Sequence, residues 1–286
     1  MTTSSKKPRR GKISGMILTA IFSAVSLVYL YPLFIMALNS FKKKAFISRA
    51  PFALPTDSRM FAGLSNYQLG IARTDFWMSL LYSVVITVLS VGLILLCTSM
   101  CAWYLSRVQN RATRALYLAF IFSMVVPFQM VMFTLSKVAN TLHLNTPLSI
   151  PIVYLGFGAG LAVFLFTGAM RSVPLAVEEA AMIDGCAPPA IFFRVVLPIL
   201  QPVCVSTGIL QAMWIWNDYL LPYLVLDVKR YRTIPIAVQY LRGGYGSVDM
   251  GAMMAVLTLA ILPIVLLYLF CQKYIVSGVM AGAVKG

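Results

Sequence analysis

The sequence predicts an all-α, polytopic membrane protein with six transmembrane helices. The first reason is composition, because 60% of the 286 residues are hydrophobic and only 11% are charged, a balance that soluble domains do not show. The second reason is the distribution of charge. Six stretches of 22 residues or more contain no Asp, Glu, Lys or Arg, and the next longest has 13. A helix needs about 20 apolar residues to cross the hydrocarbon core of a bilayer. The predicted spans are 13–41, 76–106, 115–136, 138–170, 195–217 and 250–272.

The first span follows a short basic tail. Tail and span together imitate a secretory signal peptide, but the apolar stretch is too long for one and ends in no small-residue cleavage site. We therefore predict a retained membrane anchor. Basic residues beside a membrane helix favour the cytoplasm, so the tail 1–12 is predicted to be cytoplasmic, and six crossings return the C-terminus to that side. The basic residues are Lys6, Lys7, Arg9, Arg10 and Lys12.

Charge and cysteine content exclude several classes of protein. The net charge is +15, but the basic residues are scattered over helix ends and loops, without the basic helix or aromatic-interleaved patch that indicates a nucleic-acid partner. Contact with anionic lipid headgroups explains this charge better. The five cysteines show no C-x-x-C spacing and no neighbouring His cluster. We therefore predict neither a disulfide framework nor a metal site.

Between the fourth and fifth spans, residues 178–184 hold three of the eight acidic residues of the chain. A start at Pro174 and a stop at Gly185 predict a helix of about eleven residues, roughly 16 Å long and too short to cross a membrane. Ala176, Ala180 and Ile183 share one face of this helix. The flanking acids are Glu178, Glu179 and Asp184.

This short helix could simply be a solvated loop at the membrane boundary. Acidic residues are not what orients membrane proteins, however, and the adjacent Phe192 and Phe193 are poor residues for a solvated loop. The small-residue face also has nothing within its own helix to pack against. We therefore predict that a partner protein covers it.

The stretch "EEAAMIDGCAPPAIFFRVVLPILQP" resembles the EAA loop of ABC importer permeases, the segment that docks into a cytoplasmic ATPase subunit. Cys186 departs from the pattern, which usually has alanine there, but it keeps a small residue. The segments "YPLFIMALNSFK", "WNDYLLP" and "QKYIVSGVMAGAVKG" are similar to those of carbohydrate-type permeases, so the resemblance covers nearly the whole chain. The loop pattern is met by Glu179, Ala180, Ala181, Asp184, Gly185, Phe192, Leu197 and Pro198.

The resemblance implies a single permease domain over 1–286, with a cytoplasmic coupling loop at 171–194. It implies a multi-pass protein of a prokaryotic cytoplasmic membrane, working with a second homologous permease, two cytoplasmic ATPases and an extracytoplasmic solute-binding protein. The chain has no G-x-x-x-x-G-K-[ST] phosphate loop, so it is not expected to be an enzyme or to hold a cofactor. ATP and Mg²⁺ would bind to the ATPase.

The resemblance also implies which residues couple the chain to that ATPase. Gly185 would supply a turn that no side chain should crowd. Glu179 and Asp184 would offer charge-assisted hydrogen bonds to the ATPase or within the loop. The predicted coupling residues are Glu178, Glu179, Ala180, Ala181, Asp184, Gly185, Phe192 and Pro198.

Residues that contact the solute are harder to predict. Asp218 is the only acid within an otherwise apolar span, and the aromatic and amide side chains beside it could stack on sugar rings and pair with hydroxyls. The alternative is an aromatic belt at the membrane interface with one Asp near the outer end of the helix. The candidates are Trp214, Trp216, Asn217, Asp218, Tyr219 and, in the third span, Gln129.

The predicted function is ATP-driven import of a sugar or oligosaccharide. The basic outer segments, which include Lys42 and Lys229, leave open a phosphorylated solute such as glycerol phosphate. An ion-coupled carrier is the other alternative, but it would need midplane ionisable groups and usually inverted repeats. A membrane enzyme would need a catalytic constellation, and the sequence contains none.

Overall fold

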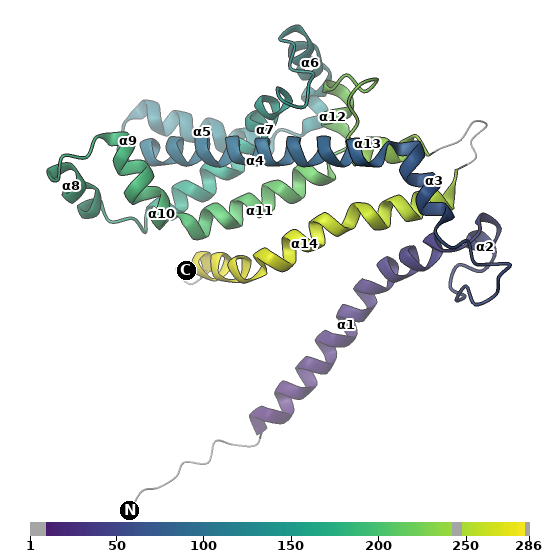
Figure 1. The fold of residues 1–286 in the computed structure, drawn as a ribbon. Helices are drawn as coiled ribbons and strands as arrows, with labels where there is room; N and C mark the ends of the chain where they lie inside the picture. Colours follow the sequence, from purple (N-terminus) through teal and green to yellow (C-terminus); the bar gives the residue numbers. More distant parts are fainter. Residues whose placement is uncertain (1–9, 242–247, 284–286) are drawn as a thin grey trace, which may run out of the picture. The chain divides into compact units, whose positions relative to one another are not determined.

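The computed structural model describes residues 10–241 and 248–283 (Figure 1). Within these ranges the chain forms helices and no strand, which confirms the predicted all-α fold class. The chain divides into two compact units, each described by itself. The first comprises Met1–Arg73 with Leu241–Leu259, and the second Thr74–Tyr240 with Ala260–Gly286.

The first unit is built around one long helix. α1 begins at the end of the basic tail and runs through the predicted first span, which it matches closely. Two short helices and the N-terminal part of α14 complete the unit. The bounds are α1 (Arg10–Ser40), α2 (Lys44–Arg49), α3 (Ser65–Thr74) and α14 (Met250–Ala283).

Lys42, between α1 and α2, is fully buried. Its Nζ donates hydrogen bonds to the carbonyl oxygens of Ala50 and Pro51, both at 2.9 Å. Its own carbonyl accepts a hydrogen bond from Asn66 Nδ2 at 2.8 Å. Burial lowers the pKa of the Lys42 ammonium, because the charge loses solvation there. The prediction that Lys42 lies on a basic outer surface is therefore wrong, since its charge is used inside the fold.

The second unit contains most of the helices. Figure 1 shows α4, α7 and α11 running side by side, with α8 to α10 following α7 at one end of the unit. The C-terminal part of α14 also belongs to this unit. The bounds are α4 (Phe76–Arg107), α5 (Arg111–Val125), α6 (Phe128–Thr141), α7 (Ile150–Met170), α8 (Leu175–Ile183), α9 (Pro188–Ile191), the π-helical turn η1 (Phe192–Val196), α10 (Leu197–Ile199), α11 (Gln201–Asn217), α12 (Leu220–Val225) and α13 (Ile234–Gln239).

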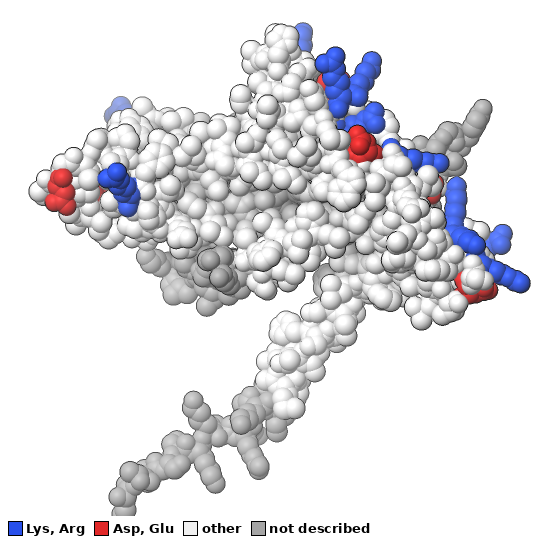
Figure 2. Space-filling view, viewed as in Figure 1, with Lys and Arg blue, Asp and Glu red and all other residues white. Residues whose placement is uncertain are grey.

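The core of the second unit depends on close helix approach. α4 turns small hydroxyl side chains inward, and α7 buries Tyr154 and Phe166. Small residues let membrane helices pack at short distance. In this unit charged side chains lie at the α8–α9 end and at the α12 end, with an uncharged surface between them (Figure 2). The buried hydroxyl residues of α4 are Ser79, Ser83, Thr87, Ser90, Thr98 and Ser99.

Among the described residues, four helices are long and apolar enough to cross a membrane, and up to six spans result if each of two bent helix pairs counts as one. This agrees with the prediction of six. The third predicted span is broken by 106° between α5 and α6. Pro127 stands at the break, where it has no N–H to donate and where it disfavours helical backbone at Val126.

Two other predicted spans also differ from expectation. The stretch 138–170 is helical only from Ile150 as a membrane span, because Lys137 lies inside α6 and a polar loop with Pro147 follows that helix. Absence of charge was therefore not sufficient to define a span. In the fifth span the chain bends by 78° between α10 and α11. Pro198 and Pro202 flank this bend, and neither has an N–H for the helical ladder.

Gly160 on α7 packs closely against α5. A Cβ there would lie 2.8 Å from the carbonyl oxygen of Phe120 and 2.7 Å from Met124 Cγ. We expect Gly160→Ala to push α5 away and to lower the thermal unfolding midpoint by about 5 °C, because overpacking costs about 1–3 kcal/mol. Gly156→Ala on the same helix is the matched control, since no atom lies within 4 Å of its Cβ. Equal midpoints for both variants would contradict this packing.

Candidate coupling site

Helix α8 has local signals at both ends. Pro174 precedes it with extended backbone and lacks the N–H that a first turn would leave unpaired. At the other end Gly185 has φ +83°. The Gly185 N–H bonds to the Met182 carbonyl and the Cys186 N–H to the Ala181 carbonyl, both at 3.0 Å. This is a Schellman cap, whose left-handed residue is usually glycine. The predicted helix is therefore confirmed, with nine residues.

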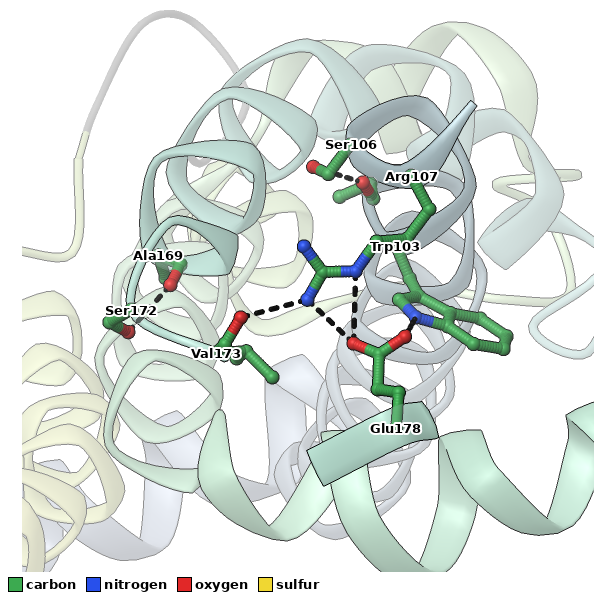
Figure 3. Close-up of polar contacts among 8 residues, drawn as sticks. Trp103, Ser106, Arg107, Ala169, Ser172, Val173 and Glu178 are labelled. Atoms are coloured by element: carbon green, nitrogen blue, oxygen red, sulfur yellow. Dashed lines mark hydrogen bonds and ion pairs between the residues drawn. The ribbon is translucent and has the colours of Figure 1, made fainter. Parts of the chain in front are cut away.

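A buried carboxylate attaches α8 to α4 (Figure 3). The Glu178 side chain is 1% exposed, and its Oε1 accepts hydrogen bonds from Arg107 Nε at 2.9 Å and Nη2 at 2.6 Å. Its Oε2 accepts one from Trp103 Nε1 at 2.9 Å. Arg107 Nη2 also donates to the Val173 carbonyl at 2.9 Å. We call Trp103, Arg107 and Glu178 the clamp.

Aromatic packing reinforces the clamp. Phe192, in η1, is fully buried and lies 5.6 Å from Trp103, measured between ring centroids. Ala181 is buried as well, one turn after Glu178. The inward side of α8 and the first residue of η1 thus pack on the end of α4, which gives the short helix a fixed attachment.

The outward side of α8 is exposed and largely apolar. Ile183 is 86% exposed and Met182 53%. Ala180 and Glu179 are exposed beside them. In the described part of the chain, the side chains of Glu179 and Asp184 have no hydrogen-bond or ion-pair partner. Exposed apolar residues rimmed by polar ones are typical of a surface that binds a partner.

The structure separates the predicted coupling residues into two groups. Glu178 does not flank the exposed face as expected, because its carboxylate faces α4. It shares this inward direction with Ala181 and Phe192. The exposed residues of this set are Glu179, Ala180, Asp184, Gly185 and Pro198.

Sequence reasoning missed Trp103 and Arg107. They lie four residues apart, so both face the same side of α4. One signal was available: Arg107 is the first charged residue after the long uncharged stretch 76–106, and only one acidic cluster lies near a span end. Nothing in the sequence shows which of the two adjacent glutamates it pairs with.

The solute candidates on α11 also divide by direction. Trp214 and Asn217 are exposed and share a face with Leu210 and Met213 at helical spacing. Trp216 points into the second unit, where its Nε1 donates a hydrogen bond to the Ala260 carbonyl at 3.3 Å. The three residues lie close together in sequence, but only the exposed Trp214 and Asn217 can contact a solute or a partner helix.

Asp218 has a structural role at the end of α11. Its Oδ2 accepts a hydrogen bond from the Tyr154 hydroxyl at 3.1 Å. Its Oδ1 accepts hydrogen bonds from the backbone N–H groups of Leu220 and Leu221, at 3.0 and 3.3 Å, which lie in the first turn of α12. Tyr219 stacks on Tyr223, with ring centroids 5.1 Å apart.

Two glutamines on α6 and α11 differ in burial. Gln129 is exposed on α6. Gln211, which sequence reasoning did not select, is buried in α11, and its Nε2 donates to the Gly158 carbonyl at 3.2 Å. Gln211 therefore ties α11 to α7.

Fold and site together define a polytopic helical membrane protein with a short, partly exposed helix between two membrane spans. The family described as "Binding-protein-dependent transport system inner membrane component" matches residues 94–280. The chain belongs to this family.

Curated relatives agree over nearly the whole length. The chain is 36% identical to the probable starch degradation products transport system permease protein AmyC of Thermoanaerobacterium thermosulfurigenes, covering 97% of this chain and 99% of the relative. It is 33% identical to the multiple sugar-binding transport system permease protein MsmG of Streptococcus mutans, covering 91% and 93%. It is 30% identical to the arabinooligosaccharides transport system permease protein AraQ of Bacillus subtilis, covering 94% and 95%.

A solved structure shows the same fold. It belongs to a bacterial ABC transporter involved in the import of the acidic polysaccharide alginate, with a TM-score of 0.77 and 22% identity, covering 95% of this chain and 99% of that chain.

Proposed function

We propose that this chain is a permease subunit of an ATP-driven importer of sugars or oligosaccharides, and that α8 docks on a cytoplasmic ATPase. One observation carries the proposal: a short helix between two membrane helices is clamped to α4 on one side and presents free apolar and acidic groups on the other. The clamp makes α8 and the end of α4 move together. Movement of a docked ATPase would therefore reach α7 and α11, which pack on α4.

This proposal implies an orientation in the membrane and a set of partners. α8 lies on the cytoplasmic side, and with six spans so do both termini. ATP and Mg²⁺ bind to two ATPase subunits, and this chain holds no cofactor. A second homologous permease completes the pathway, and an extracytoplasmic protein delivers the solute. The family name, which refers to binding-protein-dependent transport, supports this arrangement.

The solute class follows from the relatives. Starch degradation products, multiple sugars and arabinooligosaccharides are named for three of them, which supports a carbohydrate and not a phosphorylated solute. The burial of Lys42 removes part of the basic surface that suggested an anion. Membership of this family also argues against the ion-coupled carrier.

The assembly is tested by purifying the tagged chain from its native membrane in mild detergent. We expect a second permease and an ATPase to copurify, and ATP hydrolysis by the eluate to rise with one oligosaccharide and its binding protein. A chain that purifies alone, with no associated ATPase activity, would contradict the proposed function.

Trp214 tests the solute pathway. If its exposed indole stacks on a sugar ring, Trp214→Ala should raise the half-saturation concentration of transport by about fivefold to tenfold, because such contacts contribute about 1–1.5 kcal/mol. Trp214→Phe keeps a ring that can still contact Tyr154, which lies 5.5 Å from Trp214 between centroids, and should stay near wild type. Unchanged transport in Trp214→Ala would exclude this residue from the pathway.

A further inference from the structure

A second site lies beside the clamp, in a cavity of about 670 Å³ at the end of the second unit where α4 ends, α5 begins and α7 ends. Four arginines from these elements line it, and only one of them belongs to the clamp. In the described chain no Asp or Glu is part of its wall. The four are Arg107, Arg111, Arg114 and Arg171.

The positive charge of this cavity is not neutralised within the described chain. Glu178 pairs with Arg107 and with none of the other three arginines. Arg111, Arg114 and Arg171 are exposed and form no ion pair among the described residues. Three like charges around one cavity repel each other, so an anion bound between them is favoured. Guanidinium groups also match phosphate oxygens with paired hydrogen bonds.

Neutral groups in the cavity point to the same ligand chemistry. Thr167 on α7 has a buried hydroxyl with no hydrogen-bond partner in the described chain. The first turn of α5 adds the positive end of a helix dipole. Leu105, Met170 and Tyr117 supply an apolar part of the wall. The cavity thus combines donors for an oxyanion with contact surface for hydrocarbon.

The depth of the cavity in the membrane indicates which anion it binds. α4 and α7 are both long enough to cross a membrane, and both end at this cavity, at Arg107 and Met170. The ends of membrane helices lie at the depth of the lipid headgroups. Basic pockets between such helices are suited to anionic headgroups.

We propose that this cavity binds the phosphate of an anionic phospholipid. The headgroup sits between Arg111, Arg114 and Arg171, while the acyl chains leave along the apolar wall. A bound phosphate also offsets the repulsion of these arginines on Arg107, and so it strengthens the pairing of Arg107 with Glu178. This inference rests on the proposed function in one respect only, which is that the cavity lies in the cytoplasmic leaflet.

The test uses the full chain in nanodiscs of phosphatidylcholine with increasing phosphatidylglycerol, with bound lipid counted by native mass spectrometry. The double variant Arg111→Gln and Arg114→Gln is compared with wild type. Each basic group near a membrane changes the affinity for anionic lipid about fivefold, so about a 25-fold loss is expected for the pair. The matched control is Lys44→Gln with Lys229→Gln, which removes the same charge from exposed positions elsewhere. It should bind like wild type.

Three outcomes would overturn the proposal. Equal retention of phosphatidylglycerol by wild type and the double arginine variant would place the lipid elsewhere. Equal loss of lipid binding in the arginine and lysine variants would show that the effect depends only on net charge. Inorganic phosphate that displaces the lipid at millimolar concentration would identify a site for a free anion. The assay contains no ATPase, so its result is independent of whether α8 docks on one.

A further arm excludes an acidic partner protein as the occupant. In the assembly purified from native membranes, phosphatidylglycerol should remain bound in proportion to the chain. Crosslinking of Arg111 or Arg114 positions to an ATPase, with no lipid retained, would overturn the proposal in favour of a protein contact.

Discussion

Glu178→Gln should lower the thermal unfolding midpoint by about 5 °C and abolish transport. The glutamine keeps the size of the side chain but leaves the Arg107 charge, whose side chain is 24% exposed, without its counter-charge. Removing one partner of a buried pair can cost 3–5 kcal/mol, and we expect about 2 kcal/mol here because Arg107 still reaches solvent. In a chain of this size that corresponds to a shift of about 4–8 °C. Thermal unfolding in detergent and transport in proteoliposomes measure the two effects.

The neighbouring carboxylate provides the matched control. Glu179 is exposed and unpaired in the described chain, so Glu179→Gln should change the unfolding midpoint by less than about 1 °C. Under the proposed function it should still reduce the sugar-stimulated ATP hydrolysis of the assembly. If both variants unfold at the same temperature, the clamp does not hold α8.

Gly185→Asp should abolish coupling while the chain remains folded and inserted. No atom lies within 4 Å of a Cβ at this position, so the substitution creates no clash inside the chain. The left-handed backbone, at φ +83°, costs about 1–2 kcal/mol for a residue with a side chain. The larger effect comes from a charged side chain on the surface proposed to enter the ATPase. Transport should fall at least tenfold, as measured by uptake of labelled sugar.

Cys186→Ala is the control for this position. It alters the next residue, keeps a small side chain and leaves the Schellman cap intact, since the cap uses the backbone N–H of residue 186. Transport should be unchanged. Normal transport by Gly185→Asp, with wild-type amounts of protein in the membrane, would exclude α8 as the coupling element.

The membrane spans were predictable because the bilayer imposes a length on apolar helices. Where prediction failed, the cause was local backbone chemistry. The break before α6 depends on Pro127, and the late start of α7 on a polar loop without charge. Lys137 also lies inside α6, although the predicted third span ended before it because Lys137 is charged. Charge-free length therefore gave the number of spans and not their ends.

The coupling site was predictable in position but not in the direction of its side chains. The short helix and its glycine stop follow from Pro174 and Gly185. The division between Glu178 and Glu179 does not, because it depends on Trp103 and Arg107, which come from a helix more than 70 residues earlier. Long-range contacts of this kind leave no local pattern in one sequence.

The order of the two glutamates restricts how the length of this segment can change in evolution. Adjacent residues of a helix point about 100° apart, so Glu178 faces Arg107 while Glu179 faces outward. Most connections between helices tolerate insertions and deletions. An inserted or deleted residue in the first turn of α8 would turn the wrong carboxylate inward and displace the cap at Gly185. The number of residues between Pro174 and Cys186 is therefore fixed.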